Sequence, residues 1–368
     1  MANILFSCQN FLNQVGGAEI SIQTLAKALA KKHRVHVLSC GSGGDYTWEG
    51  VMVHEVSCPS NIFYINVFWG RYLDRLGFLP DLIFTQVNAA APTVFWAKNK
   101  GVPVITYVRS FEHFCLDSFK GGDVFECDHQ CFRCEGLKGL LFYPAYKIIY
   151  DRNREALLES DYVLCQSRFM QETVRHYTGR DCTLLPNIMD LNSQRVEGRG
   201  DAILFVKPIK IKGVDVVAEL VELLPGKKFL FAGETQSEYA YLCSRENVEC
   251  LGHVQNMREA YCRAKILLAP SVMADSSPRV VYEAMINGIP CITSNVGGAA
   301  EVGGNAAIKL PRQDTDAWAS EINRLFEDQE YYEHKSRESR VHAENYTLKK
   351  SLGALNGFLA GKLGFELF

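Results

Sequence analysis

The chain has 368 residues, which is longer than one ordinary hydrophobic core and therefore predicts two domains of similar size. Its composition is that of a folded globular protein, with 47% apolar and 22% charged residues. The formal net charge of -3 excludes a general attraction to nucleic acid or to anionic lipid, so we expect no nucleic-acid partner and a local positive site for any polyanion.

The opening residues indicate a strand rather than an export signal, because no basic segment precedes a long apolar run. No apolar run approaches the ~20 residues that a membrane-spanning helix needs. Thirteen cysteines without an export signal favour reduced thiols over a disulfide framework. We therefore expect a cytoplasmic protein.

In the first half of the chain, short apolar runs alternate with helical patterns, which is typical of a parallel sheet covered by helices. Four apolar side chains recur at helical spacing after the first run and predict an amphipathic helix: Ile22, Leu25, Ala26 and Leu29. The expected strands are residues 3–7, 35–40, 81–85, 103–108 and 161–165.

The alternation restarts after a polar, glycine-containing junction at residues 190–201, as expected of a hinge. The sequence thus predicts an α/β fold with two doubly wound, Rossmann-like domains, residues 1–195 and 196–345, and a final helical segment, 346–368, that packs back towards the first. Ligands of such sheets bind at the carboxyl ends of the strands, so we expect the domains to face each other across a cleft there. The expected strands of the second domain are residues 202–206, 229–232, 248–251, 265–269 and 291–294.

Gly16 and Gly17 stand between the first expected strand and its helix. Two glycines at such a turn permit positive φ and close backbone approach, and they place free N–H groups at a positive helix end. A plain tight turn is the simpler explanation for a lone glycine pair.

Three lysines follow the first strand of the second domain, and we interpret Lys207 and Lys212 as groups that neutralise a diphosphate with fixed ammonium charges. The alternative is a solvated basic loop.

Residues 270–290 carry the most specific pattern. A cap at Ser276 or Ser277 and Pro278 at the first position predict a helix that begins there. Asp275 precedes this helix and Glu283 lies within it, so the two carboxylates are expected to have separate roles. The expected buried face of the helix comprises Val281, Ala284, Met285 and Gly288.

The Asp275-x7-Glu283 pattern and residues 283–290 resemble the E-x7-E and E-A-M-x-x-G-x-P signatures of family 4 glycosyltransferases. The resemblance covers nearly the whole chain and implies a GT-B fold and a retaining glycosyltransferase. Further landmarks follow in order: Gly16-Gly17-Ala18-Glu19, Pro186-Asn187, Lys212-Gly213 and Val296-Gly297-Gly298.

The resemblance also implies roles for single residues. Glu283 would bind the donor ribose, Asp275 would lie at the transferred sugar, and Lys212 would hold the diphosphate. Gly16 and Gly17 would offer backbone N–H groups from the opposite domain.

Two of the candidate site positions depart from the family pattern. Lys207 stands where the family usually has arginine, and Asp275 replaces glutamate with a side chain shorter by one methylene, which leaves the donor open. His113 resembles the family histidine that meets the donor sugar, so it is a catalytic candidate beside Asp275. A surface or core role is the alternative for an isolated histidine.

The reaction implied is metal-independent transfer with retention, in which the departing diphosphate oxygen helps to take the acceptor proton. The donor would be linked to UDP or GDP, and the acceptor would be a glycan or a lipid-linked molecule in cell-surface polysaccharide or glycoconjugate synthesis. The alternatives are a nucleotide-sugar epimerase of GT-B fold and a non-catalytic module that binds nucleotide sugars or metal.

Two further features concern metals. Residues 314–316 read Asp-Thr-Asp, which we interpret as a helix cap followed by the apolar stripe of Trp318, Ile322 and Leu325 rather than as a metal site. A cysteine-rich insertion near residues 115–134 has thiols suited to a structural zinc ion or, less well, to an iron–sulfur cluster. Ordinary thiols or a redox disulfide are the alternative for these residues, Cys115, Cys127, Cys131 and Cys134.

Residues 140–147, followed by Arg152 and Arg154, have apolar and basic faces. Burial of this stretch within the first domain is the favoured interpretation. The alternative is a peripheral contact with a membrane that carries a lipid-linked acceptor.

Overall fold

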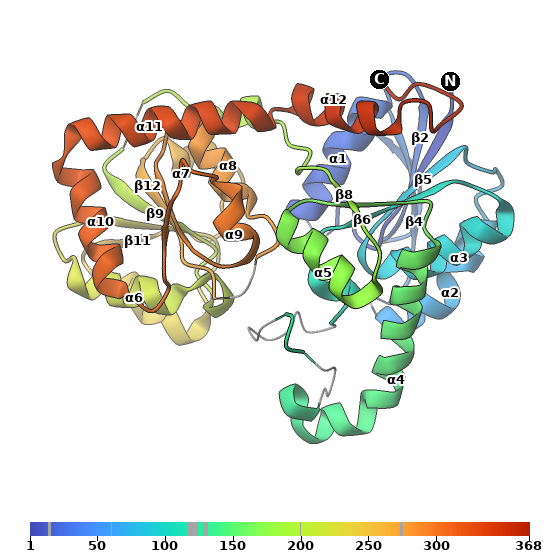
Figure 1. Cartoon of the computed structure of the whole chain (residues 1–368), viewed down its shortest axis with the longest axis horizontal. Helices are drawn as coiled ribbons and strands as arrows, with labels where there is room; N and C mark the ends of the chain where they lie inside the picture. Colours follow the sequence, from blue (N-terminus) through green and yellow to red (C-terminus); the bar gives the residue numbers. More distant parts are fainter. Residues whose placement is uncertain (14–15, 60, 116–123, 128–131, 199, 273–274) are drawn as a thin grey trace. The chain divides into compact units, whose positions relative to one another are not determined.

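The computed structural model describes the chain except for residues 14–15, 60, 116–123, 128–131, 199 and 273–274 (Figure 1). The chain divides into two compact units. Unit 1 comprises Met1–Met189 and Lys349–Phe368, and unit 2 comprises Asp190–Leu348. Each unit is built on one sheet of mainly parallel strands with connecting helices, so the predicted α/β fold with two Rossmann-like domains is confirmed.

The sheet of unit 1 contains, among the described residues, eight strands in the order β3-β4-β2-β1-β5-β6-β7-β8. Neighbouring strands run parallel except for β3 and β4. The strands are β1 (Asn3–Ser7), β2 (Arg34–Cys40), β3 (Gly44–Trp48), β4 (Val51–Val56), β5 (Leu82–Thr85), β6 (Val104–Val108), β7 (Tyr162–Cys165) and β8 (Thr183–Leu184).

The helices of unit 1 bury apolar side chains between themselves and this sheet. Trp69 is completely buried, and its indole N–H donates to Ser7 Oγ at the end of β1, 2.8 Å away. All four side chains of the predicted amphipathic stripe in α1 are buried. The helices are α1 (Gly17–Leu29), α2 (Ile62–Asp74), α3 (Ala90–Lys100), α4 (Phe132–Glu159), α5 (Arg168–Thr178) and α12 (Leu348–Leu359).

The sheet of unit 2 is entirely parallel in the part that the structure describes, with the order β11-β10-β9-β12-β13-β14. Because β9 and β12 are neighbours, the segments that follow their carboxyl ends lie side by side. The strands are β9 (Ala202–Val206), β10 (Phe229–Ala232), β11 (Val248–Cys250), β12 (Ala264–Ala269), β13 (Cys291–Ser294) and β14 (Ile308–Leu310).

In unit 2, the predicted cap and apolar stripe near residue 314 are confirmed. Asp314 Oδ1 accepts the backbone N–H of Ala317 at 3.0 Å, and Trp318, Ile322 and Leu325 are fully buried. The helices are α6 (Val214–Leu223), α7 (Arg258–Tyr261), α8 (Arg279–Ile286), α9 (Gly297–Val302), α10 (Thr315–Glu327) and α11 (Gln329–Ala343).

All ten predicted strands are present, and their bounds shift by at most one residue. Four strands were not predicted: β3, β4, β8 and β14. The antiparallel pair β3–β4 had a signal, since Glu49 and Gly50 form a two-residue loop with φ of 48° and 82°, as hairpin turns require.

The C-terminal segment packs within unit 1. Leu355 and Leu359 of α12 are buried, and Ser351 Oγ donates to the carbonyl of Asn187 at 3.4 Å. His33 Nε2 lies 3.0 Å from the carbonyl oxygen of Leu367.

The expectation of reduced thiols is wrong for six cysteines. Disulfides join Cys40 to Cys58, Cys165 to Cys182 and Cys243 to Cys250. The first two bonds link segments that the sheet places side by side, which sequence spacing does not reveal. The third joins the 3-10 helix Ser237–Ser244 to the end of β11, seven residues along the chain.

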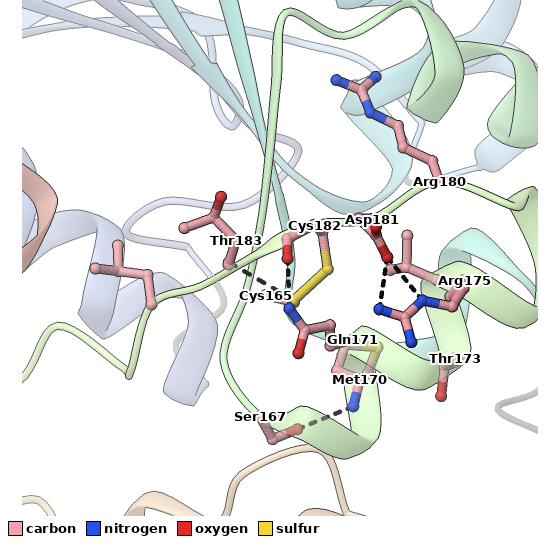
Figure 2. The surroundings of a disulfide bond; sticks show 12 residues. Cys165, Ser167, Met170, Gln171, Thr173, Arg175, Arg180, Asp181, Cys182 and Thr183 are labelled. Carbon is pink, nitrogen blue, oxygen red and sulfur yellow. Dashed lines mark hydrogen bonds and ion pairs between the residues drawn. A yellow bond between two sulfur atoms is a disulfide. The ribbon is translucent and has the colours of Figure 1, made fainter. Parts of the chain in front are cut away.

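The surroundings of the Cys165–Cys182 bond show how it supports unit 1 (Figure 2). The bond ties the end of β7 to the residue before β8, and Gln171 of α5 donates to the carbonyl of Cys182 at 2.6 Å. Arg175 and Asp181 form an ion pair at 2.6 Å beside it. The disulfide therefore fastens α5 and the edge strand to one point.

The expected burial of residues 140–147 is also wrong. Leu140, Leu141 and Phe142 of α4 are 58%, 68% and 50% exposed. In Figure 1 the first part of α4 extends away from the sheet of unit 1. No helix in the described ranges is both long enough and apolar enough to cross a membrane.

Candidate functional site

The lysine loop of unit 2, residues 207–213, is anchored at both ends. At its start, the backbone N–H of Lys207 donates to the carbonyl of Ala232 at 2.7 Å, which ties the loop to the end of β10. At its end, Gly213 has a φ of 86°, and a Cβ there would lie 1.9 Å from the carbonyl oxygen of Pro270. Only glycine fits this close approach.

Lys207 itself has a φ of 60°, in the left-handed region, and its side chain is exposed. Such a conformation costs about 1–2 kcal/mol for a residue with a side chain, and strained backbone is concentrated at functional sites. The strain occurs at one of the two lysines predicted to bind a diphosphate.

The second predicted lysine, Lys212, forms an ion pair with Asp275, the carboxylate predicted to meet the sugar. The two side chains are only 30% and 16% exposed, so solvent weakens this pair less than an open surface pair. The carbonyl of Ile211 also accepts the backbone N–H of Val272 at 3.2 Å. The structure therefore brings two predicted site residues, 63 positions apart, into direct contact.

A glycine fixes the other side of Asp275. A Cβ at Gly298, in the first turn of α9, would lie 2.1 Å from the carbonyl oxygen of Ser276 and 2.5 Å from that of Asp275. Gly213 and Gly298 thus let the lysine loop, residues 275–276 and the start of α9 pack directly against one another.

Glu283 lies in α8 and is 8% exposed. Its two oxygens accept hydrogen bonds from different partners: Tyr261 Oη at 2.7 Å and Arg279 Nη2 at 3.1 Å. Burial, followed by the charge of Glu283, raises the pKa of Tyr261 well above its usual value, so the phenol stays protonated and donates. Glu283 and Asp275 therefore have different partners, and their separate roles stay a prediction.

Sequence reasoning missed Tyr261 and Arg279 as the groups that orient Glu283. The spacing of Arg279 and Glu283, four residues apart, was a usable signal, whereas that of Tyr261 was not. The start of α8 also differs from the prediction, because Pro278 is the cap residue and the helix begins at Arg279.

In unit 1, His113 is 2% exposed at the end of a 3-10 helix, Phe111–His113. Its Nε2 accepts the backbone N–H of Val87 at 3.2 Å, which leaves the ring proton on Nδ1. Burial lowers the pKa of His113 to about 4, so the ring is neutral at pH 7. His113 can therefore donate a hydrogen bond through Nδ1 but does not carry a positive charge there.

The backbone at Val87 is unusual, since this β-branched residue has a φ of 51°. That conformation accompanies the hydrogen bond to His113. His113 also lines a cavity of about 250 Å³ in unit 1, together with Phe114, Cys127, Tyr150, Asp151, Arg154 and Tyr177.

Gly16 and Gly17 lie at the start of α1, as predicted, and neither adopts the positive φ that glycine permits. Gly16 is extended, with a φ of −116°, and Gly17 is the first helical residue. Glu19 Oε2 accepts the Gly16 N–H at 2.9 Å, so a carboxylate of the same helix occupies the group that was expected to meet an anion.

The cysteine-rich insertion is described only in part. Cys115 and Cys127 are half-buried, Cys131 lies outside the described residues, and the side chain of Cys134 in α4 is not described. The proposed metal set is therefore incomplete within the described part of the chain, and the prediction stays a prediction.

Comparisons with known proteins match both units. A family model described as "Glycosyltransferase Family 4" matches residues 15–193, and one described as "Glycosyl transferases group 1" matches residues 200–328. A Klebsiella pneumoniae protein described as an uncharacterized 42.6 kDa protein in the cps region is 23% identical over 334 residues, covering 81% of this chain and 86% of the relative.

Two solved structures have the same fold over 98% of this chain and 100% of their own. One is Anabaena HepE in complex with UDP and glucose, with a TM-score of 0.74 and 14% identity. The other is sucrose-phosphate synthase from Thermosynechococcus elongatus, with a TM-score of 0.76 and 14% identity. At this identity the likeness concerns the fold.

Proposed function

We propose that this chain, which has the two domains of a GT-B glycosyltransferase, transfers a sugar from a nucleotide-diphosphate donor with retention of configuration. One observation carries the proposal: Lys212 and Asp275 are held in contact by two glycines whose positions tolerate no side chain. A cation that can meet a diphosphate and a carboxylate that can meet a sugar hydroxyl are thereby adjacent and fixed before any ligand binds.

The roles of these residues in binding the nucleotide-sugar donor follow from the chemistry of each side chain. Lys212 and Lys207 bind the diphosphate, and a ligand that carries two phosphates competes with Asp275 for the Lys212 ammonium. Asp275, once released, accepts a hydroxyl of the sugar. Glu283, held by Tyr261 and Arg279, accepts the ribose hydroxyls.

His113 contributes as a neutral hydrogen-bond donor to the donor sugar rather than as a general base. Its Nε2 lone pair accepts the Val87 N–H, and its pKa of about 4 makes the ring a weak base near neutral pH. The acceptor proton instead passes to the departing diphosphate oxygen. Fixed positive groups then stabilise the departing charge, and each such group contributes about 10²–10³-fold to the rate of related reactions.

Catalysis is proposed to need no metal ion, because the lysine ammonium groups supply the positive charge. UDP is the favoured nucleotide, since HepE, which has the same fold, was crystallised with UDP and with UDP-glucose. The acceptor is a glycan or a lipid-linked molecule on the cytoplasmic side of a membrane. The Klebsiella relative from a cps region supports a role in cell-surface polysaccharide synthesis.

We also propose that Cys115, Cys127, Cys131 and Cys134 bind one structural zinc ion. Four thiolates are a preferred ligand set for tetrahedral zinc, and the two described members are half-buried, as metal thiolates in a small loop would be. Metal analysis of the purified chain should find about one zinc ion per molecule. Finding neither zinc nor iron would remove this proposal.

The central test compares donor binding and turnover in the Asp275→Ala and Asp201→Ala variants. Asp275→Ala should lower sugar transfer from UDP-glucose by a larger factor than it lowers UDP-glucose affinity in calorimetry, because the carboxylate acts at the sugar. Asp201, an exposed residue at the other edge of the same sheet, provides the matched charge change. Transfer should persist in EDTA.

Three outcomes would contradict the proposal. Loss of transfer in EDTA with recovery on adding magnesium would exclude the metal-free model. Equal losses in both variants would exclude the role of Asp275. Release of an epimerised nucleotide sugar, or tight binding without turnover across a panel of acceptors, would replace transfer with one of the alternative functions.

A further inference from the structure

The segment between β10 and β11, residues 233–247, lies against the lysine loop. Gln236 makes two hydrogen bonds to that loop: its Oε1 accepts the backbone N–H of Lys210 at 2.8 Å, and its own backbone N–H donates to the carbonyl of Pro208 at 3.0 Å. A Cβ at Gly233 would lie only 3.3 Å from the Cα of Lys207. Gln236 therefore holds the middle of the loop, between the anchors at its two ends.

A disulfide holds the same segment. Cys243, in the 3-10 helix Ser237–Ser244, is bonded to Cys250 at the end of β11. Thr235 lies against both sulfur atoms, since its Oγ1 is 3.7 Å from Cys243 Sγ and 3.8 Å from Cys250 Sγ. We call the Cys243–Cys250 bond, Thr235 and Gln236 together the brace, because they connect the disulfide to the lysine loop through two consecutive residues.

The rest of the segment is attached to unit 2 without the disulfide. Leu242 is completely buried in the apolar core of the unit, and Arg245 forms an ion pair with Glu222 of α6 at 2.6 Å. These contacts keep the 3-10 helix in place when the bond is broken. Breaking the bond is therefore expected to release Thr235 and Gln236 without unfolding the unit.

The disulfide of the brace is open to chemical reduction. Cys243 is exposed, so a thiolate can attack its sulfur, whereas each of the other two described disulfides contains a cysteine buried in a strand, Cys40 or Cys165. A dithiol reductant supplies two electrons and two protons: it becomes a disulfide itself, and Cys243 and Cys250 become thiols. The bond closes only 7 residues, so its loss costs the fold less than the loss of a bond that closes 17 or 18.

We propose that the Cys243–Cys250 bond is a redox switch that controls the affinity of the lysine loop for a diphosphate, with Gln236 as the positioning residue. In the oxidised chain the brace supports the loop, including the strained backbone of Lys207, which persists only where neighbouring groups hold it. In the reduced chain Gln236 is released, and a ligand must order the loop before it binds, which lowers its affinity. Disulfides in reducing compartments usually have such transient or redox-sensing roles.

The switch rests on the proposed function, because the diphosphate site belongs to it. The order of the loop is nevertheless a property of the chain alone, so it can be measured without a ligand. Hydrogen–deuterium exchange of the backbone amides reports this order, and UDP binding reports the site.

The experiment measures both quantities on the full chain in oxidising buffer and after treatment with dithiothreitol, and alkylation identifies the reduced cysteines. Three proteins are compared: the wild type, the double variant Cys243→Ser/Cys250→Ser, and Gln236→Leu. Leucine removes the acceptor oxygen of Gln236 and keeps a side chain of similar size. Dithiothreitol still reduces the other two described disulfides of the double variant, which therefore controls for their effect.

In the wild type, reduction should raise the exchange rates of the Lys210 and Gln236 amides and lower UDP affinity, each about fivefold, which is the effect of one hydrogen bond of ordinary strength. The double variant should resemble the reduced wild type in both buffers. Gln236→Leu should exchange rapidly at Lys210 and bind UDP weakly in both buffers, because the connection between the disulfide and the loop is missing.

Equal exchange of the loop in the oxidised and the reduced wild type would overturn the proposal, as would a response to dithiothreitol that persists in the double variant. UDP bound with equal affinity in the two states would also overturn it. Absence of UDP binding in both states would contradict the proposed function instead, and the exchange rates would still decide whether the brace responds to reduction.

Discussion

The two units share a sheet plan but hold their candidate residues in different ways. In unit 2, glycine positions bring backbone segments into contact, so that Lys212 and Asp275 are fixed by Gly213 and Gly298. In unit 1, single hydrogen bonds restrain the candidates: Glu19 on the Gly16 N–H and the Val87 N–H on His113. A site built by backbone packing is preformed, whereas a site restrained by one side chain can release its groups when a ligand competes.

The disulfides and the exposed apolar side chains are also distributed unequally between the two units. Of the three disulfides in the described part of the chain, unit 1 contains two, and it also exposes the apolar side chains Leu140, Leu141 and Phe142 of α4. Unit 2 contains the disulfide that closes the shortest loop. Both units have a buried apolar core, and unit 1 adds the larger number of described cross-links. Each prediction below tests one side of this contrast.

The largest effect is expected on activity in unit 2. Lys212→Gln should lower kcat for transfer from UDP-glucose by on the order of a hundredfold, because a fixed charge that stabilises the departing diphosphate is lost. Lys228→Gln makes the same charge change before β10, at the amino edge of the same sheet, and should leave kcat unchanged. Equal effects in the two variants would show that overall charge, rather than the preformed pair, matters.

The next effect concerns the cross-links. Replacing Cys165 and Cys182 together with alanine should lower the free energy of unfolding by about 3 kcal/mol, because the bond closes a loop of 17 residues. Removing the Cys243–Cys250 bond, which closes only 7 residues, should cost less, about 2 kcal/mol. Denaturant unfolding without reductant measures both.

Thiol counting provides the control for that comparison. Disulfides are rare in reducing compartments, so alkylation of the chain in intact cells also tests the proposed cytoplasmic location. Six protected cysteines would agree with the structure. If the cysteines are fully reduced in cells, the stabilising effect of the bonds is absent there and the contrast between the units rests on packing alone.

The sequence predicted those structural features that depend on the local pattern of apolar and turn residues. Ten strands followed from apolar runs between turn residues. Helical spacing predicted the burial of Val281, Ala284 and Met285 in α8 but not that of the residues between them, and Gly288 lies beyond the end of this helix. The Lys212–Asp275 contact could not be predicted from residues alone, because it requires β9 and β12 to be neighbours in the sheet. The resemblance supplied both residues but not their ion pair.

The sequence predictions that were wrong also share a physical cause. The stretch around Leu141 has the same pattern whether its apolar side is covered or exposed, because only a tertiary partner decides burial. Two of the described disulfides likewise depend on which strand ends are adjacent, and Cys40 and Cys58 meet only because β2 pairs with β4. The strand β4 belongs to the β3–β4 hairpin, which the alternating pattern of residues 44–56 could have revealed.

Acid should act on unit 1 through His113. Its pKa is about 4 in the folded chain, below the ~6.5 of an exposed histidine, so the unfolded chain binds more protons between these values. The stability that the neutral ring provides is complete above pH 6.5 and is lost as the pH falls towards 4, by about 3 kcal/mol. His113→Gln, which removes the titrating group, should flatten the dependence of Tm on pH in this window. An unchanged slope would contradict the burial argument.

The smallest effect separates backbone conformation from backbone packing. Gly179 in unit 1 and Gly213 in unit 2 both have positive φ, 71° and 86°, but a Cβ at Gly179 would meet no atom within 4 Å, whereas one at Gly213 would overlap the carbonyl of Pro270. Alanine should therefore cost about 1 kcal/mol at Gly179 from conformation alone. At Gly213 the same conformational cost is joined by overpacking, for a total of about 2–3 kcal/mol.

Calorimetric Tm values of the two variants measure the difference in stability. UDP affinity should fall only in Gly213→Ala, because only that change displaces the lysine loop from residues 270–275. Equal destabilisation with equal UDP affinity would mean that the loop adapts, and that the site in unit 2 is no more preformed than the one in unit 1.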